Sequence, residues 1–440
     1  MAGKIIIIGA GPSGLGAAYR LRELEYKDWQ IYEKNDYVGG LSASFKDDKG
    51  FTWDIGGHVI FSHYEYFDNL LEKFLNKDYL EHRRKAYIWM MKRWIPYPFQ
   101  NNIRYLPKKE AWECLMGLLS ASRRKTAAVA NFKEWILATF GEGIAQYFML
   151  PHNLKAWSYP LEEMSYSWTG EGVSVVDFKK ALRNFFFLRE DISWGPHGIF
   201  KFPLCGGTGE IFRRFIPLLK DHLFLDKEIT SIDIEKRQVI SNSQDKIPYD
   251  VLINTMPLDK FIKIAGLTKF LGVANKLRHN GVLVVGLGFK KNAFSDKCWV
   301  YFPEGNCPFY RITYFSNYSP HNVPGGGYSS LICETAYSEF KPPDTDKIVE
   351  DTILGLINTG ILSVDDRKHI VSTYLIDAEY AYPIPTLDRD NALDVIQPYL
   401  KQKNIYSCGR FGSWKYELAN TDYCLMQGVE AVDGILAGNK

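Results

Sequence analysis

The chain begins with an uninterrupted apolar run, Ile5–Ile8, that leads through glycines into a helical pattern. In the stretch KIIIIGAGPSGLGAAYRLREL, the apolar run indicates a strand and the residues after the glycines indicate a helix. The stretch WQIYEK indicates a second strand that ends at Glu33. This strand–helix–strand order predicts the start of an α/β domain.

The central region contains both helical and strand patterns. One segment carries apolar residues at helical spacing, at Phe67, Leu70, Leu71, Phe74 and Leu75. We expect helices over the ranges 65–80 and 108–190. Apolar runs typical of strands cover residues 87–99, 281–289, 298–303, 309–315 and 327–336. These runs predict an antiparallel sheet that covers a cleft, with a helical unit beside it.

A glycine-rich turn joins the first strand to its helix. Gly9, Gly11 and Gly14 form a G-x-G-x-x-G pattern, which allows a tight turn, close approach to a pyrophosphate and close helix–strand packing. The helix N-terminus offers free N–H groups to phosphates. Glu33 lies 19 residues after Gly14, where an acid that binds a ribose is expected. The pattern predicts a dinucleotide site; the alternative is a structural turn with a surface glutamate.

A second glycine pair, Gly39-Gly40, follows soon after this acid. The arrangement resembles the FAD-binding signature of amine oxidases and glutathione reductase-like flavoproteins. The glycine-rich loop at 202–215 and the strands at 222–234 and 249–257 fit this resemblance, which also places a C-terminal helix under the flavin. The residues expected to bind FAD are Gly9, Gly11, Ser13, Gly14, Glu33, Lys34, Gly40, Leu41, Gly57, His58, Ile229, Gly409, Asn420 and Thr421.

We therefore predict an α/β protein with three parts. A discontinuous Rossmann-type FAD-binding domain takes residues 1–64, 200–280 and 398–440. A helical domain takes residues 65–80 and 108–190. An antiparallel β-sheet substrate domain takes residues 85–107 and 281–397.

Composition adds little to this picture. The chain is 46% hydrophobic and 24% charged, with a net charge of +2, so we expect no nucleic-acid partner and no membrane partner. The 27 Tyr, 27 Phe and 11 Trp fit large aromatic cores or a pocket for sugars or bases. The seven cysteines form no C-x-x-C pair, and we expect buried thiols and no metal site. The N-terminus lacks the layout of a signal peptide, so a cytoplasmic location is expected; an oligomer is possible.

Several motifs together resemble the flavin-dependent UDP-galactopyranose mutases, and the eukaryotic type more than the bacterial type. They cover nearly the whole chain: GGHVIFSHYEYFD, RWIPYPFQNNI, FMLPHNLKAWSYPLEEM, FPLCGGTG, KCWVYFPEGNCPFYR, YFSNYSP, YAYPIPT and GRFGSWKYELAN. The resemblance implies an isomerase that interconverts the pyranose and furanose rings of UDP-galactose or a related nucleotide sugar. It also implies that N5 of reduced FAD attacks the anomeric carbon, with NADPH as a possible reductant and Arg84 as a weak hint of it.

The same resemblance assigns roles to individual residues. It places His58 beside the flavin ring system, after two glycines that permit conformational change. Arg311 is suited to a diphosphate, and Arg410 would lie near the sugar and the flavin. The expected catalytic residues are His58, Arg311 and Arg410. The expected substrate-binding residues are Tyr97, Phe99, Gln100, Phe148, Asn153, Trp157, His197, Trp299, Tyr301, Arg311, Tyr318, Tyr382, Arg410 and Tyr416.

Two positions depart from the family pattern. Gly172 stands where the family's W-x-G-E-R-V flap carries an arginine, and His197 replaces the asparagine of W-G-P-N. Either a nearby cation (Lys179, Lys180 or Arg189) replaces the missing charge, or the donor differs from UDP-galactose. Two other readings stay open at this point: an FAD-dependent amine oxidase or desaturase-like oxidoreductase, and a non-catalytic flavin-binding homologue.

Overall fold

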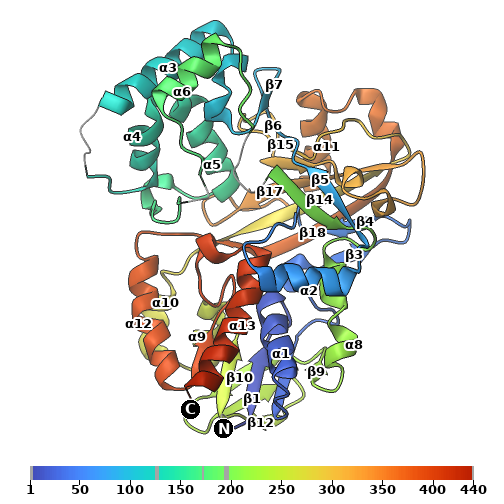
Figure 1. The fold of residues 1–440 in the computed structure, drawn as a ribbon, viewed down its shortest axis with the longest axis vertical. Helices are drawn as coiled ribbons and strands as arrows, with labels where there is room; N and C mark the ends of the chain where they lie inside the picture. The colour runs from blue at the N-terminus through green and yellow to red at the C-terminus, as the bar shows by residue number, and fades with distance from the viewer. Residues whose placement is uncertain (1–2, 124–127, 171–172, 193–197, 439–440) are drawn as a thin grey trace.

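A computed structural model describes residues 3–123, 128–170, 173–192 and 198–438 (Figure 1). Gly172 and His197, the two positions that depart from the family pattern, lie outside these ranges. The described residues form a lower layer that holds both ends of the described chain, an upper helical unit and a sheet beside that unit (Figure 1). No helix within these ranges combines the length and the apolar character needed to cross a bilayer.

The lower layer is built on a parallel sheet with the strand order β19-β13-β1-β2-β9. Its strands are β1 (Ile5–Ile8), β2 (Trp29–Tyr32), β9 (Leu223–Phe224), β13 (Val251–Asn254) and β19 (Ile405–Ser407). Ile5 and Ile7 pack into one buried cluster, and Ile6 and Ile8 pack into another. This alternation along β1 buries both faces of the sheet, as parallel sheets require.

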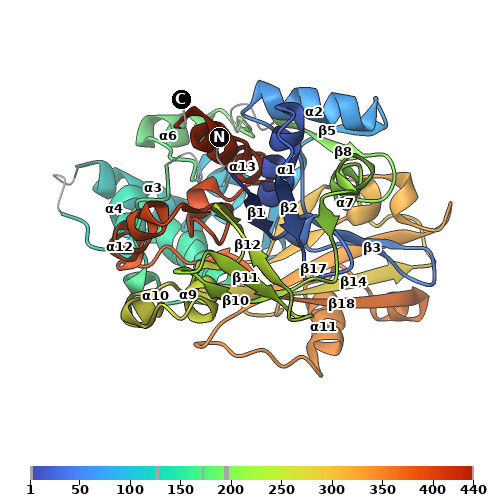
Figure 2. The ribbon, with the colours of Figure 1, turned by 90° about the horizontal axis from the view of Figure 1, so that it is seen from below.

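Two helices from opposite ends of the chain cover one face of this sheet. Helix α1 (Pro12–Glu23) lies against α13 (Thr421–Ala437), as Figures 1 and 2 both show. A Cβ atom on Gly16 would lie 2.4 Å from the carbonyl oxygen of Leu425, and one on Gly428 would lie 1.9 Å from that of Ser13. The two helices therefore touch backbone to backbone, and only glycine fits at these positions.

A mixed sheet forms the second layer, with the order β18-β14-β17-β16-β15-β6-β7. Its strands are β6 (Ala86–Met90), β7 (Arg93–Pro96), β14 (His279–Phe289), β15 (Trp299–Tyr301), β16 (Arg311–Thr313), β17 (Ser329–Tyr337) and β18 (Ile370–Pro383). The sequence predicts an antiparallel sheet, but β15 and β6 pair in parallel. Strand β6 comes from a distant segment, so no hairpin sets its direction.

The helical unit consists of α3 (Lys108–Arg123), α4 (Phe132–Ile144), α5 (Leu150–Trp157) and α6 (Phe178–Phe186). Asn131 caps α4 by accepting a hydrogen bond from the amide of Glu134, and Asp177 caps α6 in the same way. The other elements are α2 (Glu65–Leu75), β3 (Ser44–Lys46), β4 (Thr52–Asp54), β5 (Tyr79–Arg83), β8 (Ile199–Pro203), α7 (Gly209–Arg213), α8 (Ile216–Leu219), β10 (Ile229–Asp233), β11 (Gln238–Ser241), β12 (Lys246–Pro248), α9 (Leu258–Ile264), α10 (Leu271–Ala274), α11 (Ile348–Asn358) and α12 (Arg389–Gln402).

The packing of two helices differs from the predicted domain ranges. The apolar face of α2 packs into the cluster of α1 and α13, whereas residues 65–80 were expected in the helical domain. Helix α12 packs on the other face of the parallel sheet, although its first residues fall in the range expected for the substrate domain. Helical spacing shows that one face is buried, but it does not show which neighbour buries it.

Candidate active site

A cavity of about 600 Å³ is lined by residues from all three parts of the molecule. Five residues expected to bind the cofactor line it: Leu41, Gly57, His58, Asn420 and Thr421. The residues expected to bind the substrate that line it are Tyr97, Gln100, Phe148, Asn153, Trp157, Trp299, Tyr301, Arg311, Tyr382, Arg410 and Tyr416. Residues far apart in the sequence therefore face one cavity, as ligand sites between structural units do.

Of the expected substrate residues that the structure describes, two do not line this cavity. Phe99 is buried behind the wall, where its ring stacks on Phe148 with centroids 4.8 Å apart. Tyr318 is buried among Phe200 and Phe202, and its hydroxyl has no partner among the described residues. Phe99 can support the wall from behind, and a contact between Tyr318 and a phosphate stays a prediction.

The turn between β1 and α1 has the shape that a pyrophosphate site needs. Gly9 has a φ of +97°, and a Cβ on Gly14 would lie 1.8 Å from the carbonyl oxygen of Gly9. A Cβ on Gly40 would lie 3.3 Å from the Cα of Gly11, so two glycine backbones face each other closely. The bare backbone leaves N–H groups at the helix N-terminus open to phosphate oxygens.

The expected ribose acid lies beside this turn. Glu33 is 5% exposed at the end of β2, and its Oε2 accepts a hydrogen bond from the amide of Ala10 at 2.7 Å. Burial raises the pKa of Glu33. Gly409 reaches the same turn, since a Cβ on it would lie 2.4 Å from the Ser13 hydroxyl oxygen. These residues fit the ribose and pyrophosphate of FAD, whereas Ile229 is buried at the start of β10 and Lys34 is exposed.

The Gly56–His58 segment is packed too tightly for side chains at either glycine. Gly56 has a φ of +95°, and a Cβ on it would lie 2.8 Å from Oε1 of Glu334. A Cβ on Gly57 would lie 2.1 Å from the hydroxyl oxygen of Thr313. The Nδ1 atom of His58 is buried and has no partner among the described residues. An unpaired buried polar atom on a cavity wall is consistent with a ligand partner.

His58 is held in its neutral form. Burial lowers the pKa of His58 to about 3, and the nearby charges of Arg410 and Arg311 add to the effect. In the unfolded chain the imidazole takes up a proton near its ordinary pKa of 6.5. His58 therefore contributes stability that is present above that pH and is lost as the pH falls toward 3.

We expect the His58 resonances to stay constant from about pH 8 to about pH 5, because the folded imidazole does not titrate in this window. Nuclear magnetic resonance of the oxidised holoenzyme with ¹⁵N-labelled histidine measures this, and a His58→Gln variant assigns the signal. A His58 signal that titrates with a pKa near 6.5 would contradict the assignment of a neutral buried imidazole.

Arg311 is fixed by the carboxylate of Glu334, a residue that belongs to none of the sequence motifs. Its Nη2 donates to Oε1 of Glu334 at 2.7 Å, and its Nε donates to the other carboxylate oxygen. Glu334 is 2% exposed and also accepts from the Tyr310 hydroxyl at 3.2 Å. This two-point contact orients the guanidinium within the cavity wall. The available signal was a single acid within the apolar run SSLICETA of β17.

Arg410 is held differently. Its guanidinium donates to the carbonyl oxygen of Ala381 at 3.0 Å and to that of Ala419 at 2.9 Å, and it lies 5.5 Å from the ring centre of Tyr382. It forms no ion pair with the carboxylates of the described residues. Its position is fixed by neutral acceptors, so its charge stays available to an anion in the cavity.

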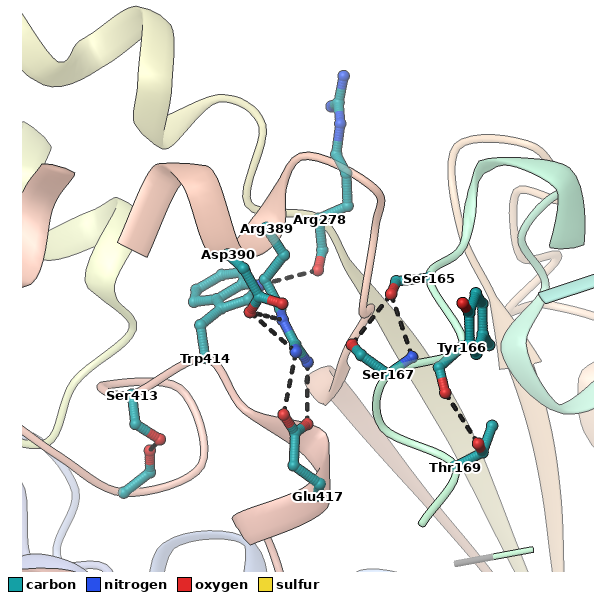
Figure 3. A network of polar contacts seen from close by, with 11 residues as sticks. Ser165, Tyr166, Ser167, Thr169, Arg278, Arg389, Asp390, Ser413, Trp414 and Glu417 are labelled. Carbon is teal, nitrogen blue, oxygen red and sulfur yellow. Dashed lines mark hydrogen bonds and ion pairs between the residues drawn. The ribbon is translucent and has the colours of Figure 1, made fainter. Parts of the chain in front are cut away.

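A second buried arginine supports the wall that carries Tyr416. Figure 3 shows the guanidinium of Arg389 facing the carboxylate of Glu417. Its Nη1 and Nη2 each donate to a different carboxylate oxygen, at 2.9 Å. The Arg389 side chain is 2% exposed, and its Nε donates to Asp390 at 3.0 Å. Glu417 itself lines the cavity and follows Tyr416 directly. No local sequence pattern links these two residues, which lie 28 positions apart.

Aromatic rings also line the cavity. The ring centres of Tyr97 and Tyr301 are 5.1 Å apart, and those of Trp157 and Tyr416 are 4.8 Å apart. The guanidinium of Arg84 lies 4.9 Å from the Trp299 ring. Flat rings beside a cation suit a base that is joined to phosphates.

Comparisons with known proteins agree with this site. A family model of flavin-containing amine oxidoreductases matches residues 12–436. A crystal structure of reduced UDP-galactopyranose mutase superposes with a TM-score of 0.96 at 42% identity, over 99% of this chain and 94% of that one. The chain belongs to the UDP-galactopyranose mutase family. Membership confirms the predicted α/β fold and FAD as the cofactor of this mutase-type chain.

Other matches are more distant. A putrescine oxidase bound to putrescine has a TM-score of 0.67 at 15% identity over 99% of each chain, and a fatty acid isomerase from P. acnes has 0.65 at 16% over 98% of each; these show the fold alone. A 4,4'-diapophytoene desaturase of Staphylococcus aureus (strain COL) is 39% identical over 87 residues. That match spans 20% of this mutase-type chain and 17% of the desaturase, so it does not extend to the whole protein.

Proposed function

We propose that the protein interconverts the pyranose and furanose rings of UDP-galactose or a related UDP-linked sugar. One observation carries this proposal: a single cavity is lined by Gly57 and His58, by the cations Arg311 and Arg410, and by aromatic rings. The similarity to a reduced UDP-galactopyranose mutase at 42% identity supports it. FAD in its reduced form would supply the nucleophile for the anomeric carbon.

The residues of the chain would bind and orient the substrate. Tyr97, Phe148 and Trp157 offer ring faces to a uracil, and the buried Gln100 offers an amide to its edge. Arg410, with no carboxylate partner among the described residues, would bind the diphosphate together with Arg311. The neutral His58 would present Nδ1 as an uncharged partner at the cofactor end of the cavity.

Redox dependence tests the proposal. We expect conversion of UDP-galactopyranose to UDP-galactofuranose after dithionite reduction, none with oxidised enzyme, and no consumption of reductant in proportion to product. UDP-glucose, GDP-sugars and TDP-sugars run in parallel identify the donor. Oxygen uptake with an amine such as putrescine, without any furanose product, would favour an oxidase and overturn the proposal.

We also propose NADPH as the physiological reductant. Arg84 lines the cavity and lies beside Tyr97 and Trp299, where a cation could meet a phosphate of the dinucleotide. Anaerobic NADPH should bleach the flavin absorbance, and Arg84→Ala should slow this bleaching while dithionite reduction stays unchanged. If NADPH bleaches the flavin at the same rate in the wild type and in Arg84→Ala, Arg84 does not take part in NADPH binding.

The protein should purify yellow, with about one FAD for each chain, and Gly14→Ala should purify nearly colourless. A Cβ on Gly14 would lie 1.8 Å from the carbonyl oxygen of Gly9, so the phosphate-binding turn must open. Absorbance at the flavin band against that at the protein band measures the content. Gly434→Ala in α13 is the matched control and should stay yellow. A Cβ added at Gly434 would meet no atom within 4 Å beyond the neighbouring backbone of its own helix.

A further inference from the structure

A second cavity, of about 840 Å³, is lined by both a lysine and a cysteine. The Nζ atom of Lys155, on α5, donates to the carbonyl oxygens of Phe302 and Glu304 at 3.1 and 2.7 Å. Its third contact is the Sγ atom of Cys307, at 3.1 Å. A lysine nitrogen and a cysteine sulfur are thus held in direct contact on the wall of a cavity that small molecules can enter.

The orientation of the thiol suits a reaction with this lysine. Cys307 is 7% exposed, and its thiol donates to the carbonyl oxygen of Phe309 at 3.5 Å. A lone pair on the sulfur therefore faces Nζ. Among the described residues, Cys307 is the cysteine whose sulfur accepts a hydrogen bond from a lysine.

The surroundings also shift the pKa values of both groups, and the contact between them couples the two shifts. Burial lowers the pKa of Lys155, so its amine loses a proton more easily than an exposed lysine does. Burial raises the pKa of Cys307, and the charge and hydrogen bond of Lys155 oppose this effect by stabilising the thiolate, the form that a peroxide oxidises. Lys341 lines the same cavity, and burial lowers its pKa as well. Glu304, which is partly buried, contributes its backbone carbonyl to Lys155, and its carboxylate accepts from the amide of Met91 instead.

We propose that Lys155 and Cys307 form a covalent, oxidation-dependent link in which one oxygen atom joins Nζ to Sγ. A hydroperoxide that enters the second cavity is the oxidant. One hydrogen peroxide oxidises the thiol to a sulfenic acid and leaves as water. A second one takes the electron pair released as the Nζ–O bond forms; the amine and the sulfenic O–H each lose one proton, and these two protons and the second peroxide give two waters. The balance is one amine, one thiol and two hydrogen peroxides to one link and three waters.

The contact distance explains why an oxygen bridge fits. One oxygen atom between nitrogen and sulfur spans the 3.1 Å contact with little movement of α5. A direct nitrogen–sulfur bond would instead require the two atoms to approach to bonding distance, against the packing of the helix. A dithiol reductant in excess should cleave the link and regenerate the amine, the thiol and water.

The link would join two walls of the first cavity. Asn153 and Trp157 lie on the same helix as Lys155, and Cys307 lies in the segment between Tyr301 and Arg311. A bond between Lys155 and Cys307 would fix these walls relative to each other. The modification is independent of the proposed function, because it needs neither flavin chemistry nor a nucleotide sugar.

Peptide mass spectrometry of the holoenzyme tests the proposal. After treatment with dilute hydrogen peroxide and digestion without thiols, we expect a linked peptide pair. Its mass should equal the sum of the two peptides plus one oxygen and minus two hydrogens, and dithiothreitol should release both peptides. Lys155→Arg keeps a donor to the two carbonyls but cannot form the link, and Cys307→Ser removes the sulfur; both should yield no linked pair.

Thermal unfolding gives a second readout. A link between residues 155 and 307 closes a long loop in the unfolded chain, so peroxide should raise the Tm of the wild type by about 3 °C. The Tm of Cys307→Ser should not rise with peroxide. Three results would overturn the proposal: Cys307 oxidised without a link, a link that lacks the oxygen, or a link that persists in Lys155→Arg.

Discussion

Arg311→Ala should raise the Michaelis constant for UDP-galactose by about 10- to 100-fold. A charge-assisted contact contributes about 1.5–3 kcal/mol, and about 1.4 kcal/mol corresponds to a factor of ten. The same change should also destabilise the protein by about 3 kcal/mol, because Glu334, 2% exposed, would keep a buried charge without its partner. Steady-state kinetics with reduced enzyme and urea unfolding measure the two effects.

A double variant separates binding from stability. Arg311→Ala with Glu334→Gln removes both charges, so most of the lost free energy of unfolding should return while the Michaelis constant stays high. Glu334→Gln alone should leave the guanidinium in place but poorly oriented. Unchanged kinetics in Arg311→Ala, or no recovery of stability in the double variant, would show that this ion pair does not organise the site.

Glu417→Ala should destabilise the protein by about 3 kcal/mol, because the buried Arg389 would keep its charge with only the half-exposed Asp390 as an ionic partner. Turnover should also fall, since Glu417 fixes the segment that presents Tyr416 to the cavity. Urea midpoints report the first effect, and separate values of kcat and KM report the second.

The chain offers a matched surface control. Arg367 contacts Glu350 through two hydrogen bonds of 2.8 and 2.6 Å, but both side chains are about half exposed. Glu350→Ala should therefore change the free energy of unfolding by less than about 1 kcal/mol. Equal losses in Glu417→Ala and Glu350→Ala would mean that burial of Arg389 does not set the strength of its pair.

The dinucleotide turn was predictable because its signal is local. Gly9 and Gly14 are needed by the backbone of one turn, Gly11 lies within that turn, and Glu33 directly follows the next strand. A short stretch of sequence contains all the physical reasons for these residues. The aromatic and basic residues of the cavity wall were predicted from the resemblance to a family and not from any local sequence pattern. Tyr97 and Arg410, for example, face the same cavity only in the folded chain.

The residues that the sequence did not identify are those that pair with residues distant in the chain. Glu334 and Arg389 each neutralise a charge far along the chain, and no spacing rule identifies such a pair. The apolar spacing of α2 predicted its helical structure correctly, but it did not show that the helix packs against α1 and α13. The strand at residues 370–383, where β18 pairs along β14, was also missed, because the strands were predicted from continuous apolar runs and polar residues interrupt this segment.

The last part of the chain completes the parallel sheet, and this has a consequence for how the protein is made. Strand β19 pairs beside β13, and α13 contacts α1 through Gly16 and Gly428. On the ribosome, the glycine turn emerges long before α13, the helix that packs against α1. The cofactor therefore meets a complete binding site only once α13 has emerged, and nascent chains stalled before α13 should not retain flavin.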